Sequence, residues 1–276
     1  MNLQHTPEPR DFPQKLNRPR WNLKGNALVS KGWMCTVHPL RVSLLLAGMV
    51  GCGSVTVDPI QVHGPCPGLP IRGPSDYAAT APPDALITDF ETGRIDLYKA
   101  VGRDGSWIFG KDTSVLGNVI YKADNACAAR GQYAGHFAAS GFNTWANWTA
   151  VFRAQPMGDA GISVPLPYDG RAYSGISFWA ASVSDADAGA ATIPVGITTM
   201  DTAWNSLDCT VCSDNYMTEV SLTSDWRRFV VSFDAVKQAG FGKPQTPLDR
   251  SQLVGFMLAP TPPFDMWIDD VRFEGL

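Results

Sequence analysis

The sequence predicts an antiparallel β-sandwich that begins near Ala85 and runs to the end of the chain. Short runs rich in Val, Ile, Phe, Trp and Thr recur along this part, separated by Gly, Asp, Asn and Pro. Helical spacers of the kind that link parallel strands do not separate these runs, which favours an antiparallel sandwich over a parallel α/β sheet. A domain of this length can bury one substantial core.

Each expected strand is an apolar run bounded by turn residues. One short helix is expected at Asp234–Gly240, because Asp234 can cap its start and Gly240 can end it. In chain order, the expected strands are Leu86–Phe90, Ser106–Phe109, Asn118–Tyr121, Tyr133–Ala139, Trp148–Arg153, Gly175–Ala181, Thr192–Thr198, Met217–Leu222, Arg227–Phe233, Leu253–Leu258 and Met266–Phe273.

A different pattern precedes the sandwich, in RVSLLLAGMVGCGS at residues 41–54. The apolar run Val42–Val50 is too short for a bilayer span of about 20 residues. Arg41 before it and small residues after it are typical of a secretory signal peptide. The stretch that ends in Cys52 resembles the lipobox of bacterial lipoproteins, with Met49 where Leu is usual. The alternative is a buried apolar strand.

The chain therefore divides into four predicted parts. Residues 1–33 are expected to be a disordered leader or to precede the true start, and residues 34–51 form the lipoprotein signal peptide. Residues 52–84 form a linker, since 53–84 hold seven prolines and four glycines. Residues 85–276 form the sandwich domain.

Charge separates the leader from the rest. The first 51 residues hold seven Lys or Arg and two acids, whereas the remainder from Cys52 holds 15 basic and 24 acidic residues. A net-acidic body argues against nucleic acid as a partner. We expect a protein that is exported and lipid-anchored to the bacterial cell envelope, at the outer membrane, or extracellular, with the lipid on Cys52 as its only membrane contact.

Six cysteines are present. If Cys35 is removed with the signal peptide and Cys52 carries the lipid, four remain, which allows three disulfide pairings in an exported chain. The spacing of Cys209 and Cys212 favours a local bridge between them. Half of a zinc site is the alternative, although no second CxxC motif or His pair accompanies it.

The order of several motifs resembles that of the galactose-binding-like jelly rolls of bacterial carbohydrate-binding modules. Family 11 modules and the complex I intermediate-associated protein 30 group are the nearest resemblances, with a likeness to lipoprotein versions in myxobacteria. The resemblance covers about residues 85–276 and implies a β-sandwich and a bias toward glycans. The motifs are ITDFETG from residue 87, GRDGSWIFGKDTS from 102, GHFAASGFNTWANW from 135, YDGRAYSGISFWA from 168, LTSDWRRFVVSFDAVKQAGFG from 222 and FDMWIDDVRF from 264.

Two adjacent acids, Asp269 and Asp270, stand inside the closing strand. Side chains alternate along a strand, so these two are expected to point to opposite faces. At least one then needs a cation or several donors. The resemblance implies a structural calcium shared by the first and last strands. We expect Glu91 and Asp270 to bind it, with Asp89 and Asp269 as further candidates; backbone carbonyls and water would complete the site. Salt bridges to Arg94 or Arg272, or plain solvent exposure, are the alternatives.

Aromatic and amide side chains mark a candidate ligand site. Trp179 is expected to look outward if Ile176 and Phe178 fill the core, although core packing is the commoner role of a Trp. Asn side chains offer both donors and acceptors to sugar hydroxyls. The remaining candidates in loop-like or rim positions are Trp145, Trp204, Asn143, Asn147 and Tyr216, with Asn215 beside the last.

His136 is the one histidine of residues 85–276. It is expected either on the ligand face or as a hydrogen-bonded strand histidine. No G-x-S-x-G elbow or nucleotide-binding glycine loop occurs in the sequence. Three functions remain, in this order: a non-catalytic glycan-binding domain whose partner is a polysaccharide or glycan, a structural or protein-interaction domain of the envelope, and a polysaccharide-cleaving enzyme, which needs two carboxylates about 5 to 10 Å apart.

Overall fold

The computed structural model describes residues 85–100, 102–114, 117–157, 162–183, 191–203, 212–241 and 247–275. All of them belong to the compact unit Ser54–Leu276. The predicted signal peptide, the lipidation site Cys52 and the linker lie outside these ranges, as do Trp204 and Cys209. Within the described ranges, no helix is long and apolar enough to cross a membrane.

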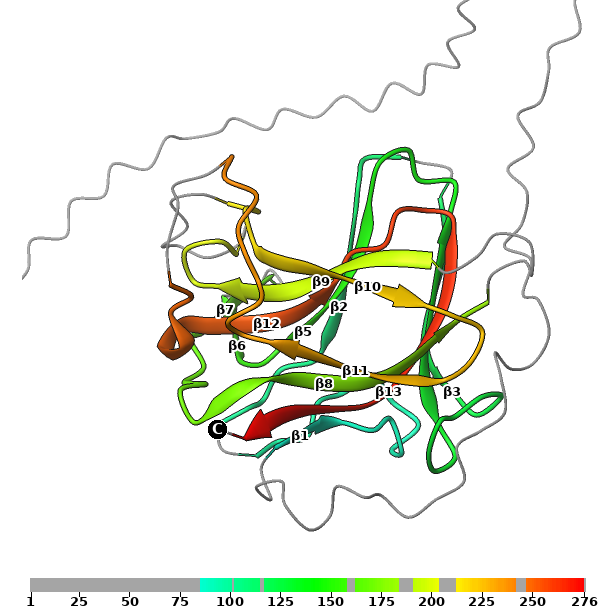
Figure 1. The fold of residues 1–276 in the computed structure, drawn as a ribbon, viewed down its shortest axis with the longest axis horizontal. Helices are drawn as coiled ribbons and strands as arrows, with labels where there is room; N and C mark the ends of the chain where they lie inside the picture. Colours follow the sequence, from blue (N-terminus) through cyan, green and yellow to red (C-terminus); the bar gives the residue numbers. More distant parts are fainter. Residues whose placement is uncertain are drawn as a thin grey trace, which may run out of the picture. The chain divides into compact units, whose positions relative to one another are not determined.

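Two antiparallel sheets face each other and form a jelly-roll sandwich (Figure 1). The six-stranded sheet has the order β11–β8–β13–β4–β3, with β1 paired to β13. Its strands are β1 (Leu86–Thr88), β3 (Asn118–Asp124), β4 (Ala134–Ser140), β8 (Tyr173–Ser182), β11 (Arg227–Ser232) and β13 (Phe264–Gly275).

The five-stranded sheet has the order β10–β9–β12–β5–β2. Its strands are β2 (Trp107–Lys111), β5 (Ala146–Val151), β9 (Ala191–Thr199), β10 (Tyr216–Leu222) and β12 (Leu253–Leu258). A separate hairpin pairs β6 (Ala154–Met157) with β7 (Ile162–Pro165). The sequence did not predict this hairpin, because its strands are short and Pro156 within β6 is untypical of a strand.

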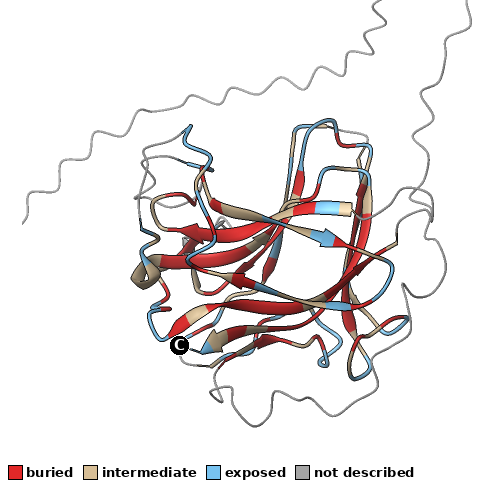
Figure 2. Cartoon of the chain, in the orientation of Figure 1, coloured by how far each residue is buried: buried red, intermediate tan, exposed pale blue. Residues whose placement is uncertain are grey.

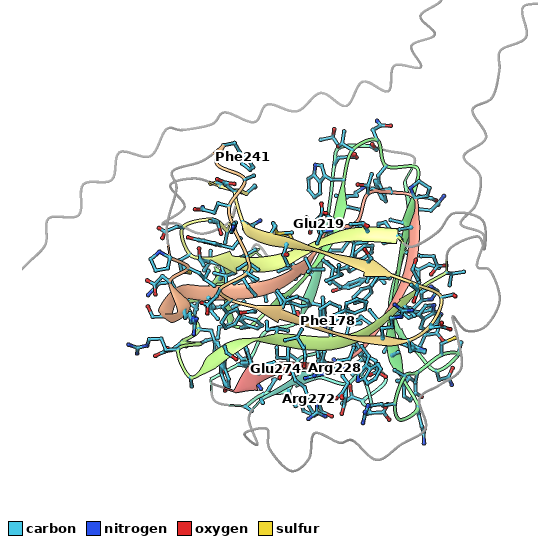
Figure 3. All side chains as sticks on the ribbon, in the orientation of Figure 1. Phe178, Glu219, Arg228, Phe241, Arg272 and Glu274 are labelled. Carbon is cyan, nitrogen blue, oxygen red and sulfur yellow. The ribbon has the colours of Figure 1, made fainter. Side chains whose placement is uncertain are left out.

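Buried side chains gather between the two sheets (Figure 2). The alternation of strand side chains explains the arrangement, because every second residue of a strand faces the partner sheet. Phe178 of β8 and Phe256 of β12 meet there with ring centroids 5.2 Å apart, and Figure 3 shows Phe178 in the interior. On β5 the inward residues are Ala146, Trp148 and Ala150, so the residues between them face away from the core.

The predicted helix at Asp234–Gly240 is wrong. The backbone of Lys237 instead exchanges two hydrogen bonds with that of Met217 at the start of β10, of 2.8 and 3.0 Å. This pairing uses the groups that a helix would need for its own ladder. The described residues form their short helix elsewhere, as a 3₁₀ turn at Arg250–Gln252 capped by the side chain of Asp249.

Candidate functional site

A cleft of about 870 Å³ lies on the outer face of the five-stranded sheet. It is open on the side away from the core, and strands β2, β5, β9, β10 and β12 all contribute to it. The described lining is mainly apolar with several amide and hydroxyl groups and one charged side chain, Lys111. The lining residues are Ile108, Phe109, Gly110, Lys111, Trp145, Ala146, Asn147, Thr149, Val151, Thr198, Thr202, Ala203, Ser213, Asn215, Met217, Val254, Met257 and Ala259.

One row of paired residues crosses the whole sheet and forms the cleft floor. Strand pairing aligns Met217 with Gly196, Gly196 with Met257, Met257 with Thr149 and Thr149 with Ile108. Gly196 in this row leaves room for the Met217 side chain, because a Cβ at Gly196 would lie 2.6 Å from the Met217 sulfur. The thioether therefore rests on the backbone of the glycine. Two of the five floor residues, Met217 and Met257, are thioethers, whose side chains are flexible and polarisable.

Trp145 forms one rim of the cleft. It precedes β5 and is 45% exposed, the most exposed tryptophan of the described residues. Its ring lies over Gly110 of β2, where an added Cβ would approach the ring to 3.3 Å and the Asn147 Oδ1 to 2.7 Å. Gly110 thus makes room for the two side chains that the sequence placed at a ligand site, and the structure brings both of them to the cleft.

Asp112 holds the loop that carries Trp145. Its Oδ2 accepts hydrogen bonds from the Thr144 backbone at 2.7 Å, the Thr144 hydroxyl at 2.9 Å and, more weakly, the Trp145 backbone at 3.4 Å. The other carboxylate oxygen accepts from the Ser114 backbone at 2.8 Å. The backbone N–H of Asp112 donates to the Trp145 carbonyl at 3.1 Å. The loop is therefore held in place before any ligand arrives.

The same contacts keep Asp112 ionised. Hydrogen bonds from Ser114, together with those from Thr144, hold the pKa of the Asp112 carboxyl well below its usual range. A carboxylate that accepts several donors is stabilised in its charged form. The sequence analysis did not identify Asp112, although the D-x-S pattern of Asp112 to Ser114 is typical of a side-chain-capped turn.

Asn215 forms the opposite rim, just before β10. Its amide nitrogen donates to the Met257 sulfur at 3.9 Å. Its amide oxygen is buried and has no hydrogen-bond partner among the described residues. The neighbouring Tyr216, which was also predicted for the site, points the other way and is buried in the core, as alternation along a strand requires.

Two further predicted residues lie away from the cleft. His136 is buried on the six-stranded sheet, where its Nε2 lies 2.8 Å from Asp265 Oδ1 and its ring stacks on Trp267 at 4.0 Å. It is thus the hydrogen-bonded strand histidine of the alternative interpretation. Asn143 is exposed in the loop before Trp145, where its backbone N–H donates to Ser114 Oγ at 3.1 Å, and it does not line the cleft.

Trp179 faces outward from the core as predicted, but on the wrong sheet for the cleft. It is part of β8, and Ile176 and Phe178 on the same strand fill the core. The outward-facing ring of Trp179 is covered by neighbouring residues. Trp179 is half-buried against the cluster around Trp226 and Trp267, and the Arg130 guanidinium lies 5.4 Å from its ring centroid.

The adjacent acids of the closing strand do not point to opposite faces. Met266 and Ile268 face the core before them, and Val271 and Phe273 after them. The strand slips by one residue between Asp269 and Arg272, and Asp270 has a positive φ of 50°. This β-bulge places both carboxylates on the outer side. The prediction of opposite faces was wrong because strict alternation does not hold through a bulge.

Both acids meet the loop at residues 130–133. Asp269 Oδ2 accepts from the Arg130 backbone at 2.9 Å, and Asp270 Oδ2 lies 3.8 Å from the Arg130 Nε. Asp270 also forms the ion pair with Arg272 that the sequence left as an alternative, at 2.6 Å. Glu91 Oε1 accepts from the backbones of Gln132 and Tyr133 at 2.8 and 2.9 Å, whereas Asp89 accepts from Tyr98 and from the Glu91 backbone.

Burial dominates the electrostatics of this acidic cluster. Burial raises the pKa of Asp269 to about 8, reinforced by Asp270 and Glu91 and opposed by the hydrogen bond from the Arg130 backbone. Among the described residues no three His, Cys, Asp or Glu side chains are grouped as a complete metal site. A calcium ion here would therefore need backbone carbonyls and water for most of its ligands. The predicted calcium site stays a prediction.

Two cysteines of the described residues, Cys127 and Cys212, are disulfide-bonded. Cys127 belongs to the buried cluster around Trp267, and Cys212 precedes the cleft residues Ser213 and Asn215. The predicted pair of Cys209 and Cys212 stays a prediction, since Cys209 lies outside the described ranges.

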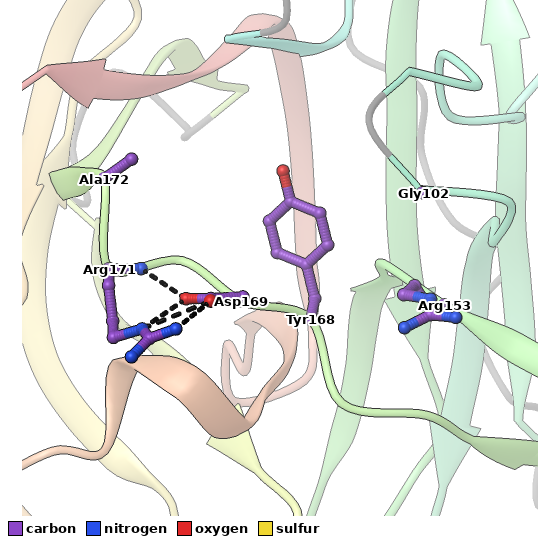
Figure 4. A pocket seen from close by; sticks show the side chains of 6 residues that line it. All are labelled: Gly102, Arg153, Tyr168, Asp169, Arg171 and Ala172. Atoms are coloured by element: carbon purple, nitrogen blue, oxygen red, sulfur yellow. Dashed lines mark hydrogen bonds and ion pairs between the residues drawn. The ribbon is translucent and has the colours of Figure 1, made fainter. Parts of the chain in front are cut away.

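A second cavity, of about 490 Å³, lies at residues 102, 153 and 168–172 (Figure 4). Its polar groups are largely paired already, with one another or with neighbouring residues. Arg171 binds Asp169 through two nitrogens, which lowers the pKa of Asp169 to about 2. Tyr168 accepts from Arg103, and Arg153 donates to the Pro167 carbonyl. This cavity offers fewer groups for a ligand than the cleft does.

Comparisons with known proteins found several solved structures that are similar to this chain. No protein-family pattern matches the chain, and no curated protein matches its sequence. The family 11 carbohydrate-binding module of Clostridium thermocellum, solved with a β-1,3-1,4-mixed-linked tetrasaccharide, is 15% identical, covering 69% of this chain and 95% of that module, with a TM-score of 0.44.

Two further solved structures are similar to this chain at comparable TM-scores. A family 30 carbohydrate-binding module is 14% identical, covering 62% of this chain and 85% of its own, with a TM-score of 0.42. An exo-β-agarase is 9% identical, covering 70% of this chain and 25% of the enzyme, also at 0.42. The predicted antiparallel jelly-roll sandwich is seen in the two sheets of this chain itself. The ligand has to follow from the cleft of this chain itself.

Proposed function

We propose that this domain binds a glycan, without cleaving it, in the cleft on the five-stranded sheet. The observation that carries the proposal is the exposed ring of Trp145, held in position by Asp112 at the rim of an apolar cleft. A flat aromatic face stacks on the apolar C–H face of a sugar ring. Amides such as those of Asn147 and Asn215 can then bind hydroxyls in either direction.

The chemistry of the described lining suits binding. Its groups are apolar, amide and hydroxyl side chains with one lysine. Cleavage of a glycosidic bond is normally performed by a pair of carboxylates flanking it. The carboxylate of Asp112, beside the Trp145 rim, is already occupied, because its two oxygens accept hydrogen bonds from the backbones of Ser114 and Thr144. The lining is therefore equipped to hold a sugar chain by stacking and hydrogen bonds.

Retention on polysaccharides tests the proposal. Purified residues 75–276 are incubated with a panel of soluble and insoluble polysaccharides, with calcium present, and depletion from solution is measured. Trp145→Ala should weaken retention about tenfold, because it removes the stacking ring. Trp179→Ala, a tryptophan change on the other sheet, is the matched control and should leave retention unchanged. If Trp145→Ala binds as tightly as the parent, the cleft is not the site.

A protein or peptide ligand is the second candidate. Met217 and Met257 favour it, because methionine surfaces adapt to varied apolar side chains. Failure of a folded domain to bind any polysaccharide of the panel would move the assignment to this function.

We also propose that the domain belongs to a lipoprotein of the bacterial envelope. The support is the signal-peptide pattern that ends in Cys52 and the Pro- and Gly-rich linker after it. Cells that express the full chain are labelled with radioactive palmitate. The parent chain should incorporate label and Cys52→Ser should not, and equal labelling of the two chains would refute the anchor.

A further inference from the structure

The side chain of Asn215 is incompletely satisfied where it lines the cleft. Its nitrogen donates only to a thioether sulfur, at 3.9 Å, which is a weak acceptor. Its oxygen is buried and has no partner among the described residues. A buried carbonyl without a donor is costly, and buried polar groups in native proteins are normally paired. A ligand that supplies a donor at this point would remove the cost.

The surface beside Asn215 is apolar. Met257 contacts the amide directly. Met217 follows two residues after Asn215, on β10, and its sulfur rests on Gly196 of β9. A sugar hydroxyl placed over these thioethers would lose its water without gaining a partner. A methyl group would instead fit against them, because thioethers pack closely around apolar groups.

Among the described residues that line the cleft, none beside Asn215 carries a charge. Lys111, the one charged side chain of the described lining, belongs to β2, and Asn215 precedes β10 at the other edge of the sheet. The Lys111 ammonium is engaged there with the Ser114 carbonyl and the Phe142 ring. Burial raises the pKa of the neighbouring Tyr216 hydroxyl, and Asp201 and Asp214 lie close enough to raise it further, so an anionic substituent such as a uronic acid is disfavoured at Asn215 and a neutral one is accommodated.

We infer that the cleft selects a glycan whose sugars carry acetamido groups, as in N-acetylhexosamines. This inference rests on the proposed glycan-binding function. An acetamido group combines the three properties in one substituent: an N–H that can donate to Asn215 Oδ1, a methyl for Met217 and Met257, and no charge. Trp145 on the β5 side lies three strand spacings away, roughly 14 Å, so its ring would stack on another sugar of the same chain.

A matched pair of oligosaccharides tests the inference. Chitohexaose and cellohexaose share length and linkage and differ in carrying an acetamido group or a hydroxyl at C2. Titration calorimetry with the parent domain should give about tenfold tighter binding of chitohexaose, the value expected for satisfying a buried acceptor. Asn215→Ala should abolish this preference without lowering the melting temperature, whereas Asn147→Ala should weaken both ligands by the same factor.

The outcomes separate the inference from the proposed function. Equal affinity for the two sugars, tighter cellohexaose, or a preference that survives Asn215→Ala overturns the acetamido assignment and leaves glycan binding intact. Binding of other polysaccharides but neither hexaose does the same. If no glycan of any kind is bound by the folded domain, the proposed function itself fails.

Discussion

The carboxylate of Asp112 sets the position of Trp145. Asp112 directly follows β2, and Trp145 directly precedes β5. Their backbones are joined by a hydrogen bond of 3.1 Å, and the Asp112 side chain accepts from the backbones of Thr144 and Trp145. A ring that is already oriented loses little conformational freedom when a ligand stacks on it, so less binding free energy is spent on ordering. Affinity should therefore depend on a residue that never touches the ligand.

Removal of this carboxylate should weaken binding while the core stays folded. Asp112→Ala is expected to lower glycan affinity roughly fivefold, because it removes the four hydrogen bonds that the carboxylate accepts from Ser114, Thr144 and Trp145. Titration calorimetry measures the affinity, and the melting temperature shows whether the core stays folded. Asp169→Ala is the control, since Asp169 is also an exposed turn aspartate but lies at the other cavity. Unchanged affinity in Asp112→Ala would contradict a positioning role.

The Trp145 loop should stay ordered in mild acid. The pKa of Asp112 is lowered from the usual 3.8 by its hydrogen bonds with Ser114 and Thr144. A depressed carboxyl pKa contributes stability that is complete above the unfolded value and is lost as the pH falls through the folded value. Ligand affinity, followed by calorimetry, should thus persist at about pH 3.8, and a loss of affinity centred there would argue that Asp112 titrates normally.

Filling the space below the ring should displace Trp145. A Cβ on Gly110 would lie 2.7 Å from Asn147 Oδ1 and 3.3 Å from the Trp145 ring. Gly110→Ala is therefore expected to weaken binding severalfold at little cost in stability, since both neighbours are side chains at the surface of the sheet. Gly275→Ala, where an added Cβ meets no atom within 4 Å, is the control. Parent-like affinity in Gly110→Ala would show that the ring can shift freely.

Calcium should stabilise the domain through the acidic cluster. The ion would neutralise Asp269, Asp270 and Glu91, which are close enough for Asp270 and Glu91 to raise the pKa of Asp269. A chelator should lower the melting temperature by several degrees, and added calcium should restore it. Asp269→Asn should abolish the response. If the melting temperature is the same with chelator and with calcium, ion pairs with Arg130 and Arg272 suffice.

Local patterns account for most of the fold. Strand β12 was predicted with its observed bounds, Leu253–Leu258, because an apolar run there is enclosed by turn residues. The hairpin β6–β7 and the turn at Lys237 were missed, since short strands and backbone pairing with a distant segment leave no periodic signal. The bulge at Asp270 was missed for a related reason: only the partner strands show where pairing slips.

The lining of the cleft was predicted only in part. Trp145 and Asn147 were identified from residue type, whereas Met217, Met257 and Asp112 were not. A lone methionine in a strand is indistinguishable from a core residue until its sheet partners are known. Trp179 shows the converse error: its outward direction follows from Phe178 on the same strand, but the sheet on which it lies does not.

The sequence alone determined most of the strands, the apolar face of most of them and where the chain carries its tryptophans and acids. These properties depend on neighbours within a few residues, where alternation and turn chemistry act. The tertiary structure alone decided which outward face is open, because burial of an outward side chain depends on loops far away in sequence. It placed Trp145 at a cleft and Trp179 against Arg130, and that difference separates a candidate ligand platform from a packed surface.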